Sequence, residues 1–248
     1  MKNPLLSLRA LFYKRLFWKN VHNYLYIIER HFKVKPRVVD YIKGSRVLVI
    51  SPHIDDDVIG CGGLLYKYHL LNIPVYVTYV TTGDKIRREE GEKIANFMHY
   101  SHVTFLDCMV NHVGKHLELV DKFTNIIESV QPDIVLVPFL IDRHTDHVNT
   151  NKFFVEACKK SPYKLFIVCG YEIWTPIIPN RIVNVSAVIE NKKHAIQICR
   201  SQFYGTNYTV LATSLNRYRG ESYNIEYGEA YYCVPVNGYI SLWEKIYE

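Results

Sequence analysis

Two short clusters of histidine and aspartate contain the residue types best suited to chemistry. The first spans residues 53–56 (His-Ile-Asp-Asp) and the second spans residues 144–147 (His-Thr-Asp-His). Imidazole nitrogens and carboxylate oxygens are ligands that zinc accepts, and a catalytic zinc site typically takes three protein ligands and leaves one position for water. The clusters therefore predict a metal-dependent hydrolytic site, in which the three ligands are His53, Asp56 and His147.

The other acidic residues of these clusters have both a chemical and a structural interpretation. Asp55 lies beside the expected ligands, where it can act as the general base that takes a proton from a metal-bound water. The run of carboxylates can also begin a helix near Gly60, as an N-cap and first-turn acids, and we assign that role to Asp57. Residues 144–147 can likewise be a solvated helix start capped by Asp146. We favour the chemical interpretation because each cluster follows an expected strand.

The elements that must position these clusters alternate along the chain after Gly44. This alternation of β-branched runs with helical stretches is typical of βαβ units, and it predicts a Rossmann-like open α/β fold, with a mostly parallel sheet and helices on both faces. From Arg219 on, we expect loops and one or two edge strands. The expected strands are 47–51, 73–82, 103–107, 133–138, 165–169 and 181–185, and the expected helices are 62–71, 88–99, 116–130, 147–160 and 188–200.

The order of the strands decides whether the two clusters meet. If the first strand is central, with the next two on one side and the fourth on the other, strand order reverses between the first and the fourth. Ligands of open parallel sheets bind at such a point, in the crevice outside the carboxyl ends of the strands. Since the clusters follow these two strands, we expect them to face one another there.

Composition and charge divide the chain into two parts. The 248 residues are 48% hydrophobic and 22% charged, which suits one sizeable globular domain. Residues 1–37 hold nine of the 30 basic side chains and one of the 24 acids, a net charge of +8, so the rest of the chain carries −2. A nearly neutral body argues against a nucleic-acid-binding core. We assign residues 1–44 to a basic amphipathic helical extension and residues 45–248 to the catalytic domain.

The setting of the protein is indicated by its cysteines and its hydropathy. The six cysteines include no C-x-x-C pair, which favours a reduced, cytoplasmic location. The chain has no run of 18 uncharged apolar residues, so we expect neither a transmembrane span nor a signal peptide. The basic segment 1–35 is expected to pack on the domain or on a second subunit, while peripheral contact with an anionic membrane remains an alternative.

The clusters and several other segments resemble one known family. Residues 51–57 (Ser-Pro-His-Ile-Asp-Asp-Asp) are similar to the AHPDDE signature of the PIG-L/LmbE-like zinc deacetylases, and residues 144–147 resemble the second motif of that family, HPDH or HxDH. Ile54 and Asp57 depart from the usual Pro and Glu. The resemblance spans about residues 46–234, because further segments match the family in order: Thr81-Thr82-Gly83-Asp84, Arg87-Arg88-Glu89-Glu90, Lys192 through Ser201-Gln202, and Gly228-Glu229-Ala230-Tyr231.

The resemblance implies an activity and a set of roles. It implies hydrolysis of the N-acetyl group of an N-acetylglucosamine-type glycoconjugate, with a small amino-sugar substrate and zinc, or another divalent metal, as cofactor. The same three ligands and the base Asp55 are implied, while His144, held protonated by Asp146, would assist at the tetrahedral intermediate. Arg87 or Arg88 could bind a phosphate or carboxylate of the substrate, although a surface helix start with paired Glu89 and Glu90 explains them equally well.

Three other functions compete with this interpretation. A metal-dependent phosphoesterase with two cations would need more bridging carboxylates than the expected strand ends offer. A non-catalytic binding or scaffold protein on the same fold is disfavoured by the intact base and ligand positions. A dinucleotide-binding protein is disfavoured because residues 60–63 (Gly-Cys-Gly-Gly) lack the G-x-G-x-x-G spacing.

Overall fold

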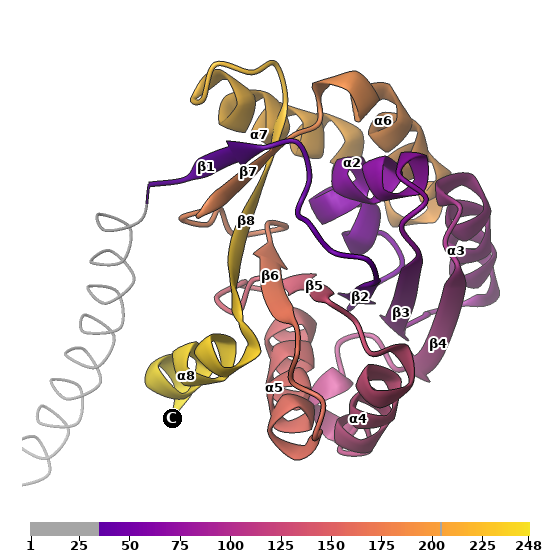
Figure 1. Cartoon of the computed structure of the whole chain (residues 1–248). Coiled ribbons are helices and arrows are strands. Elements are labelled where there is room, and N and C mark those ends of the chain that lie inside the picture. Colours follow the sequence, from indigo (N-terminus) through magenta and orange to yellow (C-terminus); the bar gives the residue numbers. More distant parts are fainter. Residues whose placement is uncertain (1–34, 204) are drawn as a thin grey trace, which may run out of the picture.

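An eight-stranded sheet organises the residues that this computed structural model describes, 35–203 and 205–248 (Figure 1). Its order is β1-β7-β8-β6-β5-β2-β3-β4, and only β8 runs antiparallel to its neighbours β6 and β7. The predicted α/β fold with a mostly parallel sheet is confirmed. The strands are β1 (Arg37–Val39), β2 (Val47–Ser51), β3 (Val75–Thr81), β4 (His102–Cys108), β5 (Ile134–Pro138), β6 (Ile167–Tyr171), β7 (Arg181–Asn184) and β8 (Gly228–Pro235).

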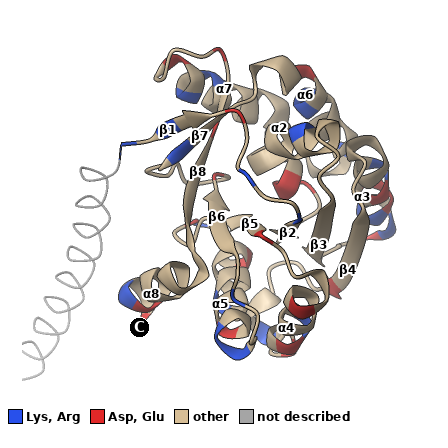
Figure 2. Ribbon diagram, in the orientation of Figure 1, with Lys and Arg blue, Asp and Glu red and all other residues tan. Residues whose placement is uncertain are grey.

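Helices cover both faces of the sheet. Figure 1 shows α2, α3, α6 and α7 on one face and α4, α5 and α8 on the other, and Figure 2 shows that α3, α4 and α5 each carry acidic and basic residues. The central strands β2 and β5 are therefore buried along their whole length, as expected for parallel strands covered on both sides. The helices are α2 (Asp56–Leu70), α3 (Lys85–Met98), α4 (Leu119–Val130), α5 (Thr145–Lys160), α6 (Ile189–Ile198), α7 (Tyr208–Glu221) and α8 (Val236–Tyr247).

The reversal of strand order lies where the sequence predicts it. β2 is the first of the expected strands, and it pairs with β3 on one side and with β5 on the other. Beyond β3 the sheet continues with β4, and beyond β5 it continues with β6. The carboxyl ends of β2 and β5 are therefore neighbours, and the segments that follow them carry the two clusters.

The C-terminal part of the chain differs from the expected loops and edge strands. β8 lies inside the sheet, between β6 and β7, and the helices α7 and α8 flank it in the sequence. These elements are hard to recognise in the sequence because some of their buried side chains are polar and are paired with other polar groups. Glu229 of β8 binds Lys192, and α7 is attached to its surroundings by Asn216 and Arg219 as well as by an apolar residue. A search for apolar periodicity misses such elements.

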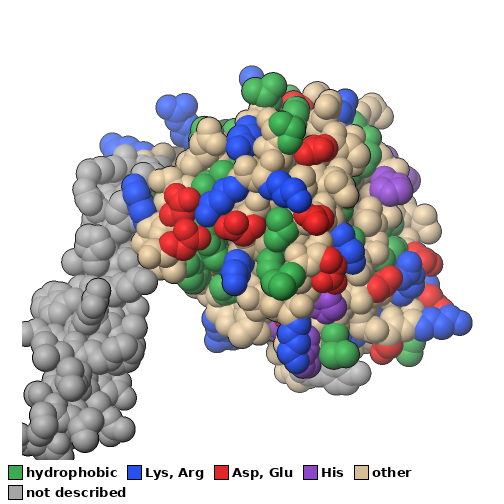
Figure 3. All heavy atoms as spheres, turned by 90° about the horizontal axis from the view of Figure 1, so that it is seen from below, with side chains coloured by type: hydrophobic (Ala, Val, Ile, Leu, Met, Phe, Trp, Pro, Cys, Tyr) green, Lys and Arg blue, Asp and Glu red, His purple; other side chains and the backbone are tan. Residues whose placement is uncertain are grey.

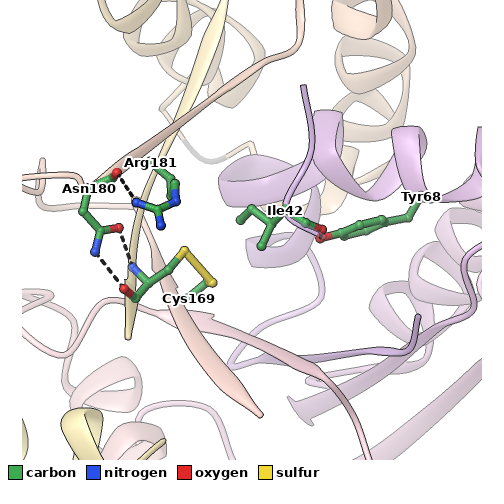
Figure 4. Close-up of a disulfide and its surroundings, with 6 residues drawn as sticks. Ile42, Tyr68, Cys169, Asn180 and Arg181 are labelled. Carbon is green, nitrogen blue, oxygen red and sulfur yellow. Dashed lines mark hydrogen bonds between the residues drawn. A yellow bond between two sulfur atoms is a disulfide. The ribbon is translucent and has the colours of Figure 1, made fainter. Parts of the chain in front are cut away.

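The N-terminal region is described from residue 35 onward. Residues 37–39 form β1 and pair with β7, and the buried Ile42 accepts a hydrogen bond from the Tyr68 hydroxyl at 2.8 Å (Figure 4). The amphipathic helix predicted in the basic segment lies outside the described residues. Within the described ranges, no helix has the length and hydrophobicity that a membrane span requires. The face shown in Figure 3 mixes basic and acidic side chains rather than presenting one sign of charge.

A disulfide joins two of the six cysteines. Cys169 of β6 and Cys233 of β8 form a disulfide between directly opposite positions of antiparallel strands (Figure 4). The backbone of Cys233 also exchanges two hydrogen bonds with the Asn180 side chain, at 2.7 and 2.8 Å. The pair was not foreseen because the two residues are 64 positions apart and β8 was not expected beside β6.

Candidate active site

The first cluster is held in a tight loop between β2 and α2. Pro52 offers its carbonyl to the backbone N–H and the hydroxyl of Thr81, at 2.9 Å each, so that β3 anchors the loop. The Ser51 hydroxyl donates to the His53 carbonyl at 2.7 Å and accepts from the Asp57 N–H at 3.1 Å. The Asp56 carboxylate accepts from the His53 N–H at 2.9 Å. These bonds fix both side chains that the sequence identifies as ligands in this loop.

The second cluster forms the first turn of α5. His144 is the N-cap residue, and its Nδ1 accepts from the Asp146 N–H at 3.2 Å. Further along the helix, the Asn151 side chain donates to the Pro138 carbonyl at 2.8 Å and to the His147 carbonyl at 3.0 Å. These two bonds join the end of β5 to the turn that contains His147. The predicted meeting of the two clusters is found, because this turn faces the loop after β2.

Three ligand atoms converge between the clusters. His53 Nδ1 lies 3.0 Å from Asp56 Oδ2, His147 Nε2 lies 3.1 Å from the same oxygen, and the two nitrogens are 3.3 Å apart. Ligand atoms bound to a tetrahedral zinc at about 2.0 Å lie about 3.3 Å from one another. The triangle therefore has the composition and nearly the size of one face of a zinc tetrahedron. His144 is the other candidate, since ring nitrogens of the three histidines lie within 4.8 Å of one another.

The second ring nitrogens of the two ligand histidines also fit a metal centre. His53 Nε2 lies 3.2 Å from Asp146 Oδ2, and His147 Nδ1 lies 3.5 Å from Asp142 Oδ1. The His147 side chain is fully buried, and its Nδ1 has no hydrogen-bond partner among the described residues. Histidines that bind metals usually present their other nitrogen to a carboxylate in this way. The donor set and its surroundings therefore suit a divalent metal.

Asp56 and the two histidines of the triangle stabilise one another's charges. Burial opposes protonation of His53, but attraction to Asp56 and hydrogen bonds with Asp146 and Asp56 outweigh burial and raise its pKa to about 10. The same balance, with Asp56 and Asp142 as partners, raises the pKa of His147 to about 9. Burial would raise the pKa of Asp56, but the two histidines hold it well below its usual range. The site thus keeps Asp56 ionised, as a metal ligand must be.

Asp55 differs from Asp56 although the two are adjacent. It is the N-cap residue of α2, but its side chain makes no capping hydrogen bond. It lines the cavity in front of the triangle. Burial raises its pKa to about 7, and the charge of Asp56 adds to this effect. Because the Asp55 carboxylate faces the cavity and does not cap the helix, it is well placed to exchange protons with a substrate.

Two sequence-based assignments in this region need correction. The carboxylate of Asp146 does not contact the His144 ring: it accepts from the N–H groups of Asn111 and Val113, at 2.6 and 3.2 Å, and faces His53. Burial and the neighbouring histidines lower the pKa of His144, which favours a neutral ring rather than the protonated ring that the resemblance implied. Since Nδ1 accepts a hydrogen bond, the ring proton of His144 is on Nε2.

Asp57 is not the N-cap of α2, which is Asp55, but it is one of the acids of the first turn, as expected. Its fully buried carboxylate accepts from the hydroxyls of Tyr79 and Tyr100, at 3.0 and 2.6 Å. Burial raises its pKa to about 7, against the effect of these hydrogen bonds. Asp57 therefore joins α2 to β3 and to the end of α3, which is a structural role.

The cavity in front of the triangle has a volume of about 170 Å³. One wall carries Trp174 and Tyr208, whose rings meet edge to face with centroids 5.8 Å apart. Arg87 also lines the cavity, whereas Arg88 pairs with Asp107 at 2.9 Å and stacks over Phe105. The structure thus brings only one of the two predicted arginines to the site. The remaining lining residues are His53, Asp55, Asp56, Ile59, Val110, Asn111, His144, Ile173 and Gln202.

Glu90 joins two segments that the family resemblance singled out. The sequence suggested a surface acid, but Glu90 is buried and accepts from the N–H and the hydroxyl of Ser201, at 2.9 and 2.5 Å. Arg87 lies nearly one turn earlier on the same helix, and Gln202 follows Ser201. This contact therefore positions two residues of the cavity wall at once.

Sequence reasoning missed Asp142 and the aromatic wall. Asp142 stands two residues before His144, and this spacing was the available signal. Trp174 and Tyr208 come from separate segments, after β6 and at the start of α7, and no local pattern distinguishes them from packing aromatics.

Comparison with known proteins places this site in context. Residues 48–158 match the PIG-L family, described as GlcNAc-PI de-N-acetylase. Over 188 residues the chain is 26% identical to the diacetylchitobiose deacetylase of Thermococcus kodakarensis, which covers 64% of this chain and 70% of that protein. The N,N'-diacetylchitobiose deacetylase of Pyrococcus horikoshii, solved with its inhibitor MPG, is similar in structure with a TM-score of 0.70 and 25% identity, covering 79% of this chain and 86% of that chain.

The fold alone does not decide the reaction. The 4-carboxy-2-hydroxymuconate hydratase GalB of Pseudomonas putida has the same fold, with a TM-score of 0.66 and 21% identity over 76% of this chain and 96% of that one. Function must therefore be argued from the site. The predicted resemblance to the PIG-L family is confirmed, by sequence over residues 48–158 and by a fold that this chain shares with a diacetylchitobiose deacetylase over 79% of its length.

Proposed function

We infer that this protein is a metal-dependent deacetylase that removes the N-acetyl group from an N-acetylated amino sugar of a GlcNAc-type glycoconjugate. The observation that carries this inference is the triangle of His53, Asp56 and His147, with Asp55 in front of it in a cavity. The similarity to two diacetylchitobiose deacetylases supports the substrate class.

The three residues of the triangle would hold the metal. Two imidazoles and one carboxylate are a common zinc ligand set, although other divalent ions accept the same donors. A divalent metal at this position supplies a Lewis acid that polarises the acetyl carbonyl and lowers the pKa of a water molecule. Zinc is our choice among these ions.

Asp55 is the proposed general base and acid. Its carboxylate lines the cavity and makes no capping hydrogen bond, so it is available to accept a proton from the water that attacks the amide carbonyl. The same carboxyl group then returns the proton to the nitrogen of the leaving amine as the C–N bond breaks. The products are acetate and the free amino sugar.

His144 is the proposed hydrogen-bond donor to the developing oxyanion. Its neutral ring carries the proton on Nε2 because Nδ1 accepts from the Asp146 N–H, and the ring lines the cavity. A preorganised donor of this kind contributes about 10²–10³ to the rate. Arg87 and the Trp174–Tyr208 wall would bind the sugar, since aromatic faces and a guanidinium suit its CH and hydroxyl groups.

The test is hydrolysis by the purified full-length protein. We would supply N,N'-diacetylchitobiose, N-acetylglucosamine and N-acetylated sugar phosphates, and measure acetate and free amine. We expect release that stops after treatment with a chelator and returns when zinc is added. If the zinc-loaded protein releases acetate from none of these substrates, the proposed function is contradicted. Elemental analysis should give one metal ion per chain, whereas two would favour the phosphoesterase alternative.

A further inference from the structure

Asp142 contacts both the metal triangle and the wall of the cavity. Its Oδ1 accepts from the His144 N–H at 2.9 Å and faces His147 Nδ1 at 3.5 Å, while its Oδ2 accepts from the Trp174 N–H at 3.1 Å. The carboxylate side chain is only 2% exposed. A buried carboxylate with three partners from two different segments is held in one orientation.

We propose that Asp142 is a positioning residue, which orients the His147 imidazole toward the metal and ties the metal centre to the Trp174 wall. When Nε2 binds a metal, the proton of the neutral ring must be on Nδ1. That N–H is fully buried and makes no hydrogen bond with the described residues, but it faces the Asp142 carboxylate at 3.5 Å. A carboxylate at this place selects the tautomer and makes Nε2 a stronger donor to the metal.

The geometry around His53 supports the same principle. Asp146 faces His53 Nε2 at 3.2 Å and also accepts from the backbone N–H of Asn111, a residue of the cavity wall. Each ligand histidine is therefore joined by one carboxylate to one part of the wall. Asp142 does for His147 and Trp174 what Asp146 does for His53 and Asn111.

This inference rests on the metal centre of the proposed function, but it is tested without any substrate. Zinc affinity of the full-length Asp142→Asn variant is measured by competition with a chromophoric chelator. The amide keeps the size of the side chain and one acceptor oxygen, but it removes the charge that faces His147. We expect the affinity to fall about 10–100-fold, as for other residues that orient metal-binding histidines. An unchanged affinity would overturn the inference.

Glu172→Gln is the matched control. Glu172 is a buried carboxylate of the same wall segment as Trp174, where it accepts from the Ile177 N–H at 2.7 Å and pairs with Arg219. Its hydrogen bonds and ion pair within the described residues involve no histidine. We expect its zinc affinity to equal that of the unmodified protein. An equal loss of affinity in both variants would show that displacement of the wall is the cause, which would also overturn the proposed role.

A measurement on the unmodified protein covers the case in which Asp142→Asn does not fold. In zinc-loaded protein labelled with ¹⁵N-histidine, the Nδ1 proton of His147 should give a slowly exchanging, downfield resonance. Binding of the metal through Nδ1 would refute the proposal. If the unmodified protein binds zinc but releases no acetate, the substrate assignment fails and this inference stands, whereas a protein that binds no divalent metal refutes both.

Discussion

Replacing Lys192 by methionine should reveal how α2, the helix that follows the loop of the first cluster, is held in place. Lys192 Nζ lies 2.7 Å from Glu229 Oε1, and both side chains are fully buried. Breaking a buried ion pair costs about 3–5 kcal/mol, because the remaining charge is left without compensation. Glu229 keeps three other donors, the N–H groups of Gly63 and Leu64 and the Tyr231 hydroxyl. We therefore expect the lower end of this range, about 3 kcal/mol.

The three remaining donors show why Glu229 matters to α2. The helix is kinked at Cys61, whose φ of −135° is not helical. Counted from this kink, Gly63 and Leu64 are at the N2 and N3 positions of a new helix start, where N–H groups need an acceptor. Glu229 supplies this acceptor from β8, at 2.7 and 2.9 Å. Its carboxylate is therefore both an ion-pair partner and a helix cap.

Thermal denaturation of the metal-free protein, monitored by circular dichroism, would measure these effects without stabilisation by a bound ion. For a chain of this size, about 3 kcal/mol corresponds to a fall in Tm of about 6–12 °C. Lys193→Met is the control, because Lys193 pairs with the exposed Glu190, and such surface pairs contribute at most about 1 kcal/mol. Equal stability of the Lys192 and Lys193 variants would refute the stabilising role of the buried Lys192–Glu229 pair.

A double variant separates the ion pair from the cap. Replacing a whole buried pair by apolar residues is often neutral. In Lys192→Met/Glu229→Leu, however, the N–H groups of Gly63 and Leu64 lose their acceptor, at a cost of about 1–3 kcal/mol each. The double variant should therefore remain less stable than the unmodified protein. Full recovery of stability would show that Glu229 does not cap the helix.

Four further predictions follow from the site and its support. Asp55→Asn should lower kcat by about 10²–10⁴-fold while elemental analysis still finds the metal. His147→Ala should lose both the metal and turnover. An Asp55→Asn variant without metal would contradict the assignment of Asp55 as base rather than ligand. Arg87→Ala should raise KM for the sugar and Arg88→Ala should not, because only Arg87 lines the cavity; equal KM values would remove Arg87 from the binding site. Gly60→Ala should destabilise the fold by about 1–3 kcal/mol in the same denaturation assay, because its Cβ would lie 2.2 Å from the Tyr171 ring, and an unchanged Tm would contradict this contact. Deleting residues 1–34 should leave acetate release intact, since the lining residues of the cavity lie between 53 and 208, and a folded but inactive truncation would oppose this.

The sequence predicts the features of this protein that depend on local signals. Runs of β-branched residues identified six strands, and an assumed order with the first strand in the centre gave a switch point between β2 and β5, where the structure has it. Because the two clusters follow these strands, two and six residues after their last residues, this order implied that the clusters meet. The position of β8 could not be inferred, because its strand partners are remote and its buried Glu229 looks like a surface residue in the sequence.

The site shows the same division between local and remote information. The spacing of His53 and Asp56 indicates ligands, but it does not reveal what their neighbours contact. The family resemblance implied that Asp146 holds the His144 ring, yet the helical turn directs its carboxylate toward His53. The partner of Glu90, Ser201, is 111 residues away. Side-chain direction and remote pairing are set by packing, which residue types alone do not disclose.

The two departures from the family signature have local physical explanations. Ile54 replaces a proline, and its side chain is 1% exposed, packed where Gly91 of α3 passes close by. Asp57 replaces a glutamate, and the hydroxyls of Tyr79 and Tyr100 both reach its shorter side chain. Neither residue belongs to the triangle or lines the cavity. Both substitutions change the support under α2 and leave the reacting groups in place, so they are compatible with the chemistry proposed for the site.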